Sequence, residues 1–556
     1  NKKMMDQVDS VHSDVLIIGG GPSGLATAIR LADLLKHHKL QRRIVLVDKG
    51  NAIGSHILSG AVIKTSVFKQ LLPEVDFKDI PFDAKVKRDA VMLMSKTGKI
   101  KIPFPVPFMR NKGNYLASLA TISRFLAKIA EEKGVEIYSG FSVNEILYEN
   151  GKVAGAKTIA TGVDAMGNPM ENFQAGTAVY VDLVVFAEGT RGTLSKQLIA
   201  KYSLDKNSNK QMYSLGCKEL WHIPEGRIQA GTAYNCMGYP LNRHEFGGGF
   251  IYGLNDNTLA LGLVVGLDYE DPTFDVHHAF QVWKTHPFIS ALLQGGKLLE
   301  YGAKTLPEGG FYAIPQVYTD HALIVGDSAG FLAMPALKGI HLAMESGMLA
   351  AETAIKALST NDFSEASLRY YDELLKKSRI YKELYPFRNF RQGFSGGLIA
   401  GFVRAAFLLI TKGAGISGRI RPLADSETTK RLKDFKRKTF RQRFEHELDF
   451  DKVISFDKVT DVYYSGTRHD EHQVPHLRVN NPQSFAAINI KEYGAPCQYF
   501  CPAEVYEIRT DKNGNKELRI HFENCVHCKT CDIKSPGDGI SWMLPNGDNG
   551  PDYHYM

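Results

Sequence analysis

The sequence has 556 residues, enough for two or three domains with sizeable hydrophobic cores. Hydrophobic residues make up 44% and charged residues 23%, as in ordinary globular proteins, and the net charge of +7 is too small to indicate a nucleic-acid partner. No uncharged apolar run reaches about 18 residues, which argues against a membrane-spanning helix.

A dinucleotide site is predicted near the amino terminus. Residues 13–18 are an apolar run typical of a buried parallel strand, and residues 19–24 read Gly-Gly-Gly-Pro-Ser-Gly, which matches G-x-G-x-x-G. Residues 25–36 have helical character, and a second strand at 43–47 ends in Asp48. A strand, this motif, a helix and an acid-ended strand in that order are typical of a dinucleotide-binding fold.

Each residue of this motif has a physical role in such a site. Gly19 permits a tight turn, Gly21 lets the backbone approach a pyrophosphate, and Gly24 lets the helix pack closely on the strand. The amino terminus of the helix faces the phosphates. Asp48 can accept hydrogen bonds from ribose hydroxyls.

A downstream segment favours FAD over NAD. Residues 322–325 predict another strand, Gly326 and Asp327 follow it, and a long alanine-rich helix begins near residue 340. FAD-binding folds of the glutathione-reductase or hydroxylase type resemble this arrangement. In those folds the aspartate holds the ribityl chain, and the helix amino terminus faces the flavin pyrimidine. Taken alone, Gly326-Asp327 is equally compatible with an ordinary turn.

Two more segments support an FAD protein without a nicotinamide domain. Residues 183–187 and the loop 188–192 resemble the strand and loop near the adenine end of the same folds. Lys338 and Gly339, just before the long helix, complete the predicted flavin contacts. A second G-x-G-x-x-G match at 413–418 is not followed by an apolar helix, so we do not interpret it as a nicotinamide site. The electrons are therefore expected to come from another protein.

Three apolar stretches are predicted to lie in a membrane surface. Residues 101–109 form a proline-stiffened loop, 115–130 have apolar residues at helical spacing, and 398–410 predict an apolar helix too short to span a bilayer. Residues 430–443 carry a basic cluster suited to anionic lipid head groups. Taken singly, each apolar stretch is better explained as a piece of core, and the basic run as a solvated helix. Together they predict monotopic membrane association.

Five of the seven cysteines lie within residues 497–531. Three of them form the run Cys525-Val-His-Cys528-Lys-Thr-Cys531, and Cys501 is followed by a proline. Thiolates three residues apart on one loop can converge on a single iron–sulfur cluster. We therefore predict one [4Fe–4S] cluster with Cys501 as the fourth ligand.

Structural zinc and disulfide bonds are the alternatives. Two C-x2-C pairs with a spacer would favour zinc, whereas this pattern is a triplet with a distant single cysteine. No secretory signal precedes the cysteines, which argues against disulfides. Cys497 could replace Cys501 as a ligand, but the proline after Cys501 is common in cluster loops. Cys217 and Cys236 stand alone and are expected to be buried apolar residues.

From about Asp14 to the carboxyl end, the chain resembles the electron transfer flavoprotein–ubiquinone oxidoreductase family. The resemblance rests on the cysteine triplet and on residues 54–60 (GSHILSG), 246–252 (FGGGFIY), 260–269 (ALGLVVGLDY), 335–341 (PALKGIH) and 501–506 (CPAEVY). It implies a mixed α/β (α+β) protein with a Rossmann-like FAD-binding fold of the glutathione-reductase or hydroxylase type. A quinone-binding α+β domain is inserted into this fold, and a ferredoxin-like [4Fe–4S] domain ends the chain.

The resemblance also implies domain boundaries. The FAD-binding domain is expected to be discontinuous, and the predicted boundaries are 1–85, 115–210 and 305–375 for this domain, 86–114 and 211–304 for the ubiquinone-binding domain, and 376–556 for the membrane-facing segment and the [4Fe–4S] domain. The chain begins close to its first predicted strand, which favours a protein without a long presequence.

The family pattern places ligands on particular residues. The implied cluster ligands are Cys501, Cys525, Cys528 and Cys531. Gly247 and Gly248 are implied to bind the quinone head group through hydrogen bonds. Gly249 stands where the family pattern has serine, and from the residues alone three glycines predict a flexible turn.

The function implied by the resemblance is that of an electron-transferring-flavoprotein dehydrogenase. It would accept electrons from reduced electron transfer flavoprotein and pass them through a [4Fe–4S] cluster and FAD to ubiquinone, linking fatty-acid and amino-acid oxidation to the respiratory chain. No catalytic acid or base is predicted, because the cofactors supply the chemistry. The expected location is peripheral, on an inner membrane, facing the cytoplasm of a bacterium or the matrix of a mitochondrion.

One alternative shares the FAD fold. An FAD-dependent monooxygenase or prenyl reductase with a zinc-stabilised tail would need NAD(P)H and would show a flavin spectrum without cluster absorbance.

Overall fold

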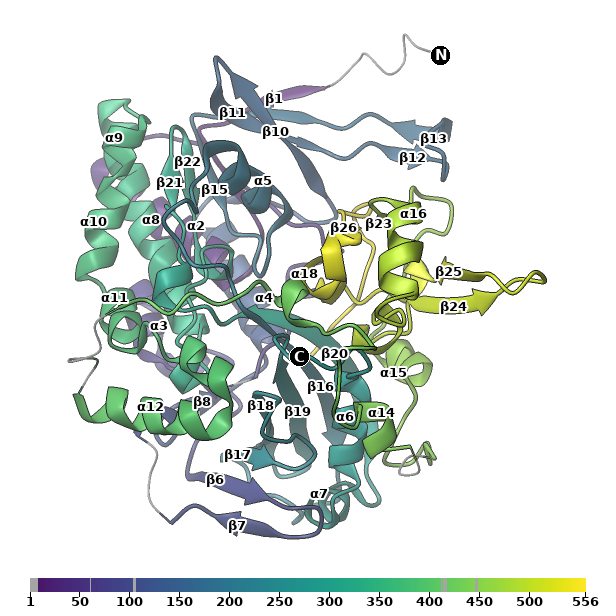
Figure 1. Cartoon of the computed structure of the whole chain (residues 1–556). Coiled ribbons are helices and arrows are strands. Elements are labelled where there is room, and N and C mark those ends of the chain that lie inside the picture. The colour runs from purple at the N-terminus through teal and green to yellow at the C-terminus, as the bar shows by residue number, and fades with distance from the viewer. Residues whose placement is uncertain (1–8, 61, 104–106, 412, 414–417, 446–448) are drawn as a thin grey trace.

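The computed structural model describes residues 9–60, 62–103, 107–411, 413, 418–445 and 449–556 (Figure 1). Its amino-terminal part has the predicted strand, turn and helix. Strand β2 (Val15–Ile18) leads into α2 (Pro22–His38), and β3 (Ile44–Val47) pairs with β2 in parallel. Both strands are buried along their whole length, as expected for a parallel sheet covered on both faces.

β2 lies inside a mostly parallel sheet with the order β21-β22-β15-β2-β3-β9. Its other strands are β9 (Glu136–Tyr138), β15 (Leu183–Phe186), β21 (Tyr318–Thr319) and β22 (Ala322–Ile324). Because β2, β15 and β22 run in parallel, the loops that follow them meet at one edge. The long helix α8 (Ile340–Thr360) packs on α2. This edge brings the predicted nucleotide segments together.

A second sheet lies below the first in Figure 1 and has the order β20-β16-β19-β18-β17-β6-β7. Its strands are β6 (Arg88–Met94), β7 (Lys99–Lys101), β16 (Tyr213–His222), β17 (Thr232–Gly238), β18 (Gly247–Asn255), β19 (Thr258–Gly266) and β20 (Lys297–Pro307). Helix α6 (Val276–Lys284) packs on β16 and β19, and α7 (Pro287–Leu293) follows it. β6 joins this sheet although it precedes β16 by more than a hundred residues.

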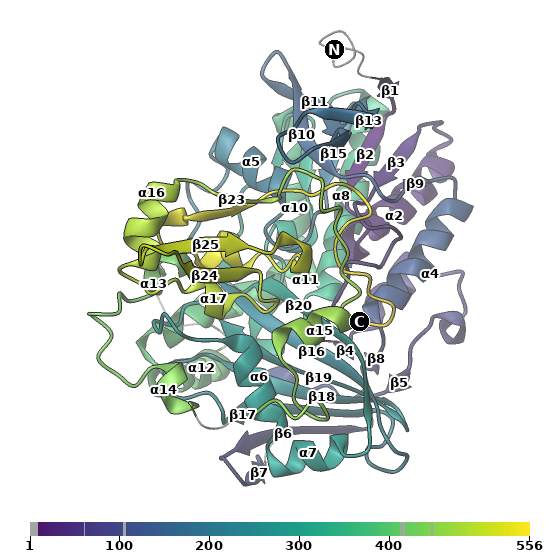
Figure 2. The ribbon, with the colours of Figure 1, turned by 90° about the vertical axis from the view of Figure 1, so that its right-hand side faces the viewer.

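The carboxyl-terminal part packs against the second sheet (Figure 2). Its elements are α15 (Lys458–Tyr464), β23 (Leu477–Val479), α16 (Pro482–Phe485), α17 (Cys497–Phe500), β24 (Tyr506–Thr510), β25 (Lys516–Ile520), α18 (Thr530–Lys534) and β26 (Ile540–Trp542). Side chains of both parts, such as Trp221 and Trp542, share one hydrophobic core. The cysteine loop is therefore fixed to the sheet.

The remaining elements extend or cover these parts. The strands are β1 (Ser10–His12), β4 (Val62–Ile63), β5 (Ala84–Lys85), β8 (Tyr115–Leu116), β10 (Val143–Glu149), β11 (Lys152–Thr158), β12 (Thr161–Val163), β13 (Pro169–Gln174) and β14 (Ala178–Tyr180). The helices are α3 (Ser66–Leu71), α4 (Leu119–Glu132), α5 (Thr193–Tyr202), α9 (Glu365–Leu368), α10 (Tyr370–Lys377), α11 (Arg379–Leu384), α12 (Leu398–Thr411), α13 (Asp425–Thr428) and α14 (Phe440–Arg443).

The prediction that residues 115–130 lie in a membrane surface is wrong. Their apolar stripe, with Leu119, Ile122 and Leu126, is buried in the core around the first sheet, where α4 packs on α2. The helical spacing was therefore that of an ordinary core helix.

The other membrane-surface segments have mixed outcomes. Residues 398–410 do form a helix, α12, and it exposes apolar side chains. Residues 104–106 of the proline loop and 414–417 of the rejected glycine motif lie outside the described residues. Among the helices that are described, none combines the length and apolar character needed to cross a membrane.

A fully buried ion pair joins strand β16 of the second sheet to helix α6, which packs on it. Lys284 Nζ lies 2.6 and 2.8 Å from the two carboxylate oxygens of Glu219, and neither side chain is exposed. Trp221 Nε1 also donates to Glu219, at 2.6 Å. Removal of the lysine would leave a buried carboxylate without its counter-charge, the costly case for a buried pair.

We therefore expect Lys284→Met to destabilise the protein by about 3–5 kcal/mol, measured as the free energy of unfolding in urea. Lys376→Met is the matched control, because Lys376 pairs with Asp372 at 2.7 Å but is 60% exposed. The control should cost less than about 1 kcal/mol. Equal losses in the two variants would contradict the importance of burial.

Candidate functional site

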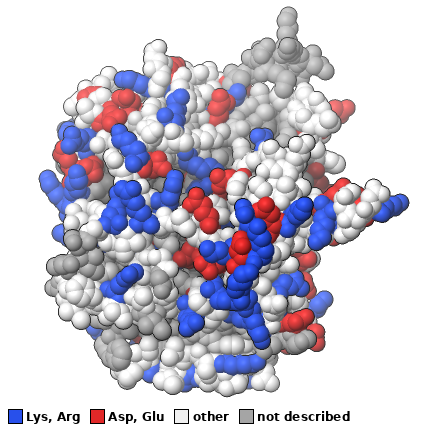
Figure 3. Space-filling model, in the orientation of Figure 1, with Lys and Arg blue, Asp and Glu red and all other residues white. Residues whose placement is uncertain are grey.

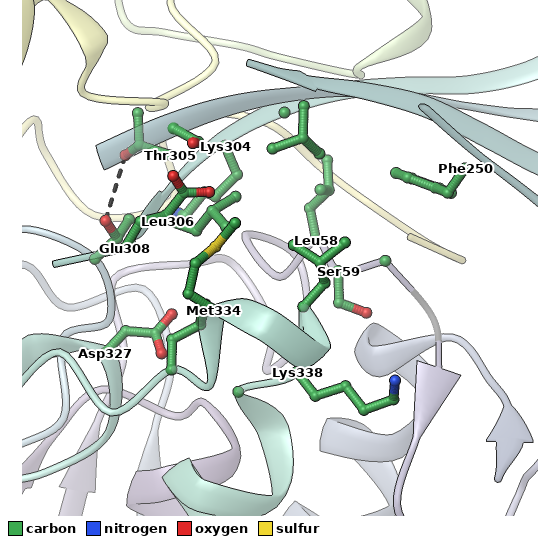
Figure 4. A pocket seen from close by; sticks show the side chains of 18 of the residues that line it. Leu58, Ser59, Phe250, Lys304, Thr305, Leu306, Glu308, Asp327, Met334 and Lys338 are labelled. Atoms are coloured by element: carbon green, nitrogen blue, oxygen red, sulfur yellow. Dashed lines mark hydrogen bonds between the residues drawn. The ribbon is translucent and has the colours of Figure 1, made fainter. Parts of the chain in front are cut away.

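A cavity of about 970 Å³ lies between the two sheets and α12 (Figure 4). Its volume is at the upper end of the range for small-molecule sites, about 300–1,000 Å³. Of the predicted flavin residues, those that line it are Gly19, Gly21, Asp48, Asp327, Lys338 and Gly339. Gly24 and Gly326 lie behind its wall and are not in contact with it.

The glycine turn after β2 has the geometry that a pyrophosphate site needs. Gly19 has a φ of +113°, and a Cβ there would lie 2.2 Å from Ala187 O. A Cβ on Gly24 would lie 2.0 Å from Gly19 O, so the helix packs against the turn at van der Waals limits. Gly21 is the N-cap of α2, and a Cβ there would meet nothing within 4 Å. The open space in front of the α2 amino terminus fits a phosphate group.

Asp48 is held in place by main-chain donors. Its Oδ2 accepts from Gly20 N at 2.7 Å, and its Oδ1 accepts from Gly50 N at 2.8 Å. The carboxylate therefore lines the cavity in a fixed orientation at the end of β3, where a ribose is expected.

The GD pair also forms part of the cavity wall. Gly326 (φ +62°) begins a short 3₁₀ turn, and its N–H donates to Ser346 Oγ at 2.9 Å. Asp327 faces the cavity (Figure 4), and burial raises its pKa to about 6 although the nearby Lys304 acts in the opposite direction. Lys304 comes from β20 of the second sheet. Lys304 carries no recognisable signal in the sequence, because its interaction with Asp327 joins segments from different sheets.

Lys338 and Gly339 stand at the start of α8. Gly339 is its N-cap, and Lys338 Nζ donates to Asn111 Oδ1 at 2.6 Å and to Ala336 O at 3.1 Å. Burial, together with the charge of Lys64, lowers the pKa of Lys338 to about 8. The amino terminus of a long helix thus points at the cavity, as the sequence predicted for a flavin site.

The three consecutive glycines open strand β18, so the alternative of a flexible turn is wrong. Gly247 and Gly248 both line the cavity. Neither position has room for a side chain. A Cβ would lie 2.3 Å from Val264 O at Gly247 and 2.6 Å from Cys236 O at Gly248. A Cβ on Gly249 would meet the Trp283 ring at 2.3 Å.

The cavity reaches the surface between α12 and the β6–β7 hairpin. Phe402 on α12 and Leu93 on β6 both line it, and they are 46% and 52% exposed. The neighbouring surface is also apolar, with Val403 68%, Ile410 83% and Ile100 70% exposed. These exposed apolar side chains could contact an apolar molecule that enters the cavity.

The four predicted cluster ligands surround a second, small cavity of about 20 Å³. It is lined by Cys501, Cys525, Cys528 and Cys531, whereas Cys497 is buried outside it. His527 (φ +57°) and Lys529 (φ +66°) adopt left-handed conformations that curl the loop around the cavity. All seven cysteines lie in the described part of the chain and are free of disulfide bonds. The sulfur atoms are thus brought together without being joined to each other.

Two buried donors next to this cavity fit an iron–sulfur cluster. Tyr506 Oη and Trp542 Nε1 belong to residues that line it, and each donor interacts with a cysteine of the triplet, Tyr506 with Cys531 and Trp542 with Cys525. The sulfur atoms of a cluster are acceptors that such donors could serve. Burial raises the pKa of Cys501 to about 12 and that of Cys528 above its usual value, so a metal centre would be the counter-charge that stabilises the thiolates.

A group of three histidines beside the cysteine loop, two of them buried, was not predicted from the sequence. Nitrogens of His469, His476 and His527 lie within 4.8 Å of one another, close enough to share a metal ion. His469 Nε2 and His527 Nε2 are 2.9 Å apart, and His527 Nδ1 is 2.8 Å from Lys49 Nζ. These contacts already form a continuous hydrogen-bonded chain. Only His527 carried a sequence signal, its place in the cysteine run.

Three family models match the chain. Residues 452–554 match the model described as electron transfer flavoprotein-ubiquinone oxidoreductase, 4Fe-4S, residues 213–306 match ETF-QO, ubiquinone-binding, and residues 17–71 match an NAD(P)-binding Rossmann-like domain. The mitochondrial electron transfer flavoprotein-ubiquinone oxidoreductase of Arabidopsis thaliana is 40% identical over 552 residues, covering 99% of this chain and 85% of the relative. The chain belongs to the electron transfer flavoprotein–ubiquinone oxidoreductase family.

The human family member, also named mitochondrial, is 38% identical over 557 residues, covering 98% of this chain and 89% of the relative. Among solved structures, a geranylgeranyl bacteriochlorophyll reductase-like protein from Thermoplasma acidophilum has a TM-score of 0.55 at 17% identity, covering 74% of this chain and 94% of that one. This likeness shows the fold alone.

Family membership confirms the predicted fold class and cofactors. The protein is an oxidoreductase with a Rossmann-like FAD-binding fold, a ubiquinone-binding domain and a carboxyl-terminal domain for one [4Fe–4S] cluster. Because the 4Fe-4S model spans all four predicted ligands, the alternative of a monooxygenase or prenyl reductase with a zinc-stabilised tail is set aside. The domain boundaries and the roles of individual residues stay predictions.

Proposed function

We propose that the protein accepts electrons from reduced electron transfer flavoprotein and delivers them through its cluster and FAD to ubiquinone in a membrane. This would link fatty-acid and amino-acid oxidation to the respiratory chain. The names of the relatives support the two partners. The observation that carries the proposal is the cavity that extends from the nucleotide turn to an exposed apolar mouth. Such a cavity can hold a flavin at one end and an apolar acceptor at the other.

We assign the proposed flavin contacts to different parts of the FAD molecule. Gly21 and the amino terminus of α2 would bind the pyrophosphate, with Gly19, Gly24 and Gly326 shaping the turns behind it. Asp48 would accept from the ribose and Asp327 from the ribityl chain, and Lys338 and Gly339 would lie at the flavin ring. When bound, FAD exchanges one or two electrons and the cluster, on Cys501, Cys525, Cys528 and Cys531, exchanges one.

We assign the quinone head group to Gly247 and Gly248. Strand β17 pairs with β18 only as far as Gly249, opposite Cys236, so the two preceding glycines keep a backbone edge outside that ladder. Backbone groups at such an edge can bind a carbonyl oxygen without an added side chain. The apolar walls formed by α12 and β6 would exclude water from the head group.

The apolar mouth is the part that would contact the membrane. Helix α12 and the β6–β7 hairpin, which carry exposed apolar side chains, lie at the lower left and at the bottom of the ribbon in Figure 1. One basic residue lies beside α12, since the main-chain oxygen of Arg243, a cavity-lining residue, accepts from Leu398 N at 3.4 Å. We propose a monotopic position on an inner membrane, facing the mitochondrial matrix or the bacterial cytoplasm.

The basic run 430–443 supports this position only in part. Figure 3 shows blue side chains gathered near the centre of one face, with red ones between them. Arg437 pairs with Glu270 at 2.8 Å and Arg443 with Glu245 at 2.9 Å, so part of the charge is neutralised within the protein. The apolar surface therefore contributes more to membrane binding than the basic run.

The double substitution Phe407→Asp/Ile410→Asp tests this function. Both side chains are exposed, at 46% and 83%, so the fold should persist. We expect binding to phosphatidylcholine–phosphatidylglycerol vesicles to weaken at least about tenfold, because each buried apolar side chain contributes about 1.5–3 kcal/mol. Reduction of long-tailed ubiquinone in those vesicles by reduced electron transfer flavoprotein should slow, while a short-tailed soluble quinone should be reduced normally.

The control is Met166→Asp, which changes an 88% exposed residue on the β12–β13 hairpin, far from α12 in Figure 1. It should bind vesicles as the unmodified protein does. Unchanged vesicle binding by the double variant would contradict the assignment of α12 to the membrane.

A further inference from the structure

Two loops from distant parts of the chain meet between the large cavity and the cysteine cavity. Residues 188–190 line the large cavity, and the loop 525–531 carries three of the four proposed cluster ligands. Lys529 lines both cavities. We call the contact between these loops the interloop seam, and its members are Thr190, Arg191, Lys196, Thr305, Cys528, Lys529 and Asp532.

Lys529 ties the cysteine loop to the flavin side of the seam. Its Nζ donates to Thr190 O at 3.0 Å and to Arg191 O at 2.9 Å, and the residue is 6% exposed. The left-handed conformation at Lys529 turns its side chain across the boundary while the neighbouring cysteines remain at the small cavity. Because these bonds are largely desolvated, they are stronger and more directional than surface contacts.

Two cationic side chains from the flavin side of the seam, those of Arg191 and Lys196, donate to Asp532. Arg191 donates to its carboxylate through Nε and to its main-chain oxygen through Nη2, the latter at 3.0 Å. Lys196 on α5 lies 2.8 and 3.0 Å from the two carboxylate oxygens. The Asp532 side chain is 5% exposed and also accepts from Trp542 N at 3.1 Å. Each loop therefore contributes a side chain that binds the other loop.

A further hydrogen bond joins the seam to the second sheet. Thr305, a buried residue of β20 that lines the large cavity, donates through Oγ1 to Cys528 O at 2.7 Å. Its hydroxyl also lies 3.4 Å from Thr190 Oγ1. On the flavin side, Glu188 accepts from Ser195 N at 2.7 Å and so fixes the loop that carries Arg191. A proposed cluster ligand is thus one hydrogen bond away from the wall of the flavin cavity.

We propose that the interloop seam fixes the separation and the electronic contact between the flavin and cluster sites, with Arg191, Lys196 and Asp532 as positioning residues. The inference rests on the proposed function, in which electrons pass between these two sites. The rate of such a transfer falls steeply with the distance between the two sites. A boundary held by directional charged bonds therefore keeps the distance, and with it the rate, uniform. Apolar packing alone would allow the loops to slide.

The test uses the protein loaded with FAD and cluster and the variant Arg191→Gln/Lys196→Met. Both substitutions lie on the flavin side of the seam and leave the cysteine loop unchanged. We expect amide hydrogen exchange in residues 188–196 and 525–532 to become about tenfold faster, which corresponds to about 1.4 kcal/mol. Pulsed electron paramagnetic resonance on partly reduced protein should show a broader distribution of flavin-to-cluster separations.

The matched control is Lys201→Met, which removes an exposed lysine from the same helix; this lysine lies over Tyr148 instead of the cysteine loop. Lys196→Arg should behave as the unmodified protein. If the double variant loses a cofactor, the milder Lys196→Met decides by the same measurements. Exchange rates and separations equal to those of Lys201→Met would overturn the proposal. Dithionite supplies the electrons, so a failure of the proposed partners would not affect this outcome.

Discussion

Cys501→Ala is expected to abolish the iron–sulfur cluster, whereas Cys497→Ala should leave it in place. The two cysteines are four residues apart and are joined by a bond from Cys501 N to Cys497 O at 3.3 Å. Both are buried, at 6% and 1% exposure, so the substitutions are alike in size and surroundings. Only Cys501 lines the small cavity with the cysteine triplet. Without Cys501, only the three thiolates of the triplet would remain at this cavity.

The measurement is iron and acid-labile sulfide per chain after anaerobic purification. About four of each are expected for the unmodified protein and for Cys497→Ala, as a [4Fe–4S] cluster requires, with a large loss in Cys501→Ala. FAD content should stay the same in both variants, because the flavin cavity is formed by other residues. The reverse pattern, with loss of iron in Cys497→Ala alone, would show that the ligand assignment is wrong.

Gly21→Val is expected to remove FAD without unfolding the protein. A Cβ at Gly21 meets nothing within 4 Å and points into the open space before α2. A larger side chain there would occupy the volume proposed for the pyrophosphate. We expect FAD affinity to fall about 100-fold, from an overpacking cost of about 3 kcal/mol.

FAD content by absorbance and unfolding in urea should be measured together. Gly98→Ala is the control, since its Cβ would meet only Ser95 Oγ at 3.3 Å on the distant β6–β7 turn. Gly24→Ala should differ from both, because its Cβ would lie 2.0 Å from Gly19 O and must destabilise the fold as well. Normal FAD content in Gly21→Val would contradict the placement of the pyrophosphate.

Many of the proposed cofactor-binding residues could be predicted from the sequence because they lie in short motifs. The turn after β2 depends on glycines a few residues apart, and the cysteine triplet lies on one short loop. In both cases the spacing along the chain nearly determines the spacing in space. Asp327 and the start of α8 were predictable for the same reason, since each follows a recognisable strand or loop.

Contacts between distant segments could not be predicted in this way. The apolar periodicity of α4 is the same whether it faces core or membrane, and only its packing on α2 decides between them. The three glycines of β18 owe their small size to Trp283 and to backbone oxygens of other strands. Lys304 and the histidines beside His527 enter their sites through tertiary contacts that leave no pattern in the sequence.

The central claim is that electrons pass from electron transfer flavoprotein to ubiquinone through this chain. The most direct measurement mixes catalytic amounts of the protein, carrying FAD and cluster, with reduced electron transfer flavoprotein and ubiquinone under anaerobic conditions. We predict that ubiquinol forms at two electrons per molecule, and that Cys501→Ala and Gly21→Val both lower the rate severely. Ubiquinol formation at the uncatalysed rate, or full activity in both variants, would contradict the account.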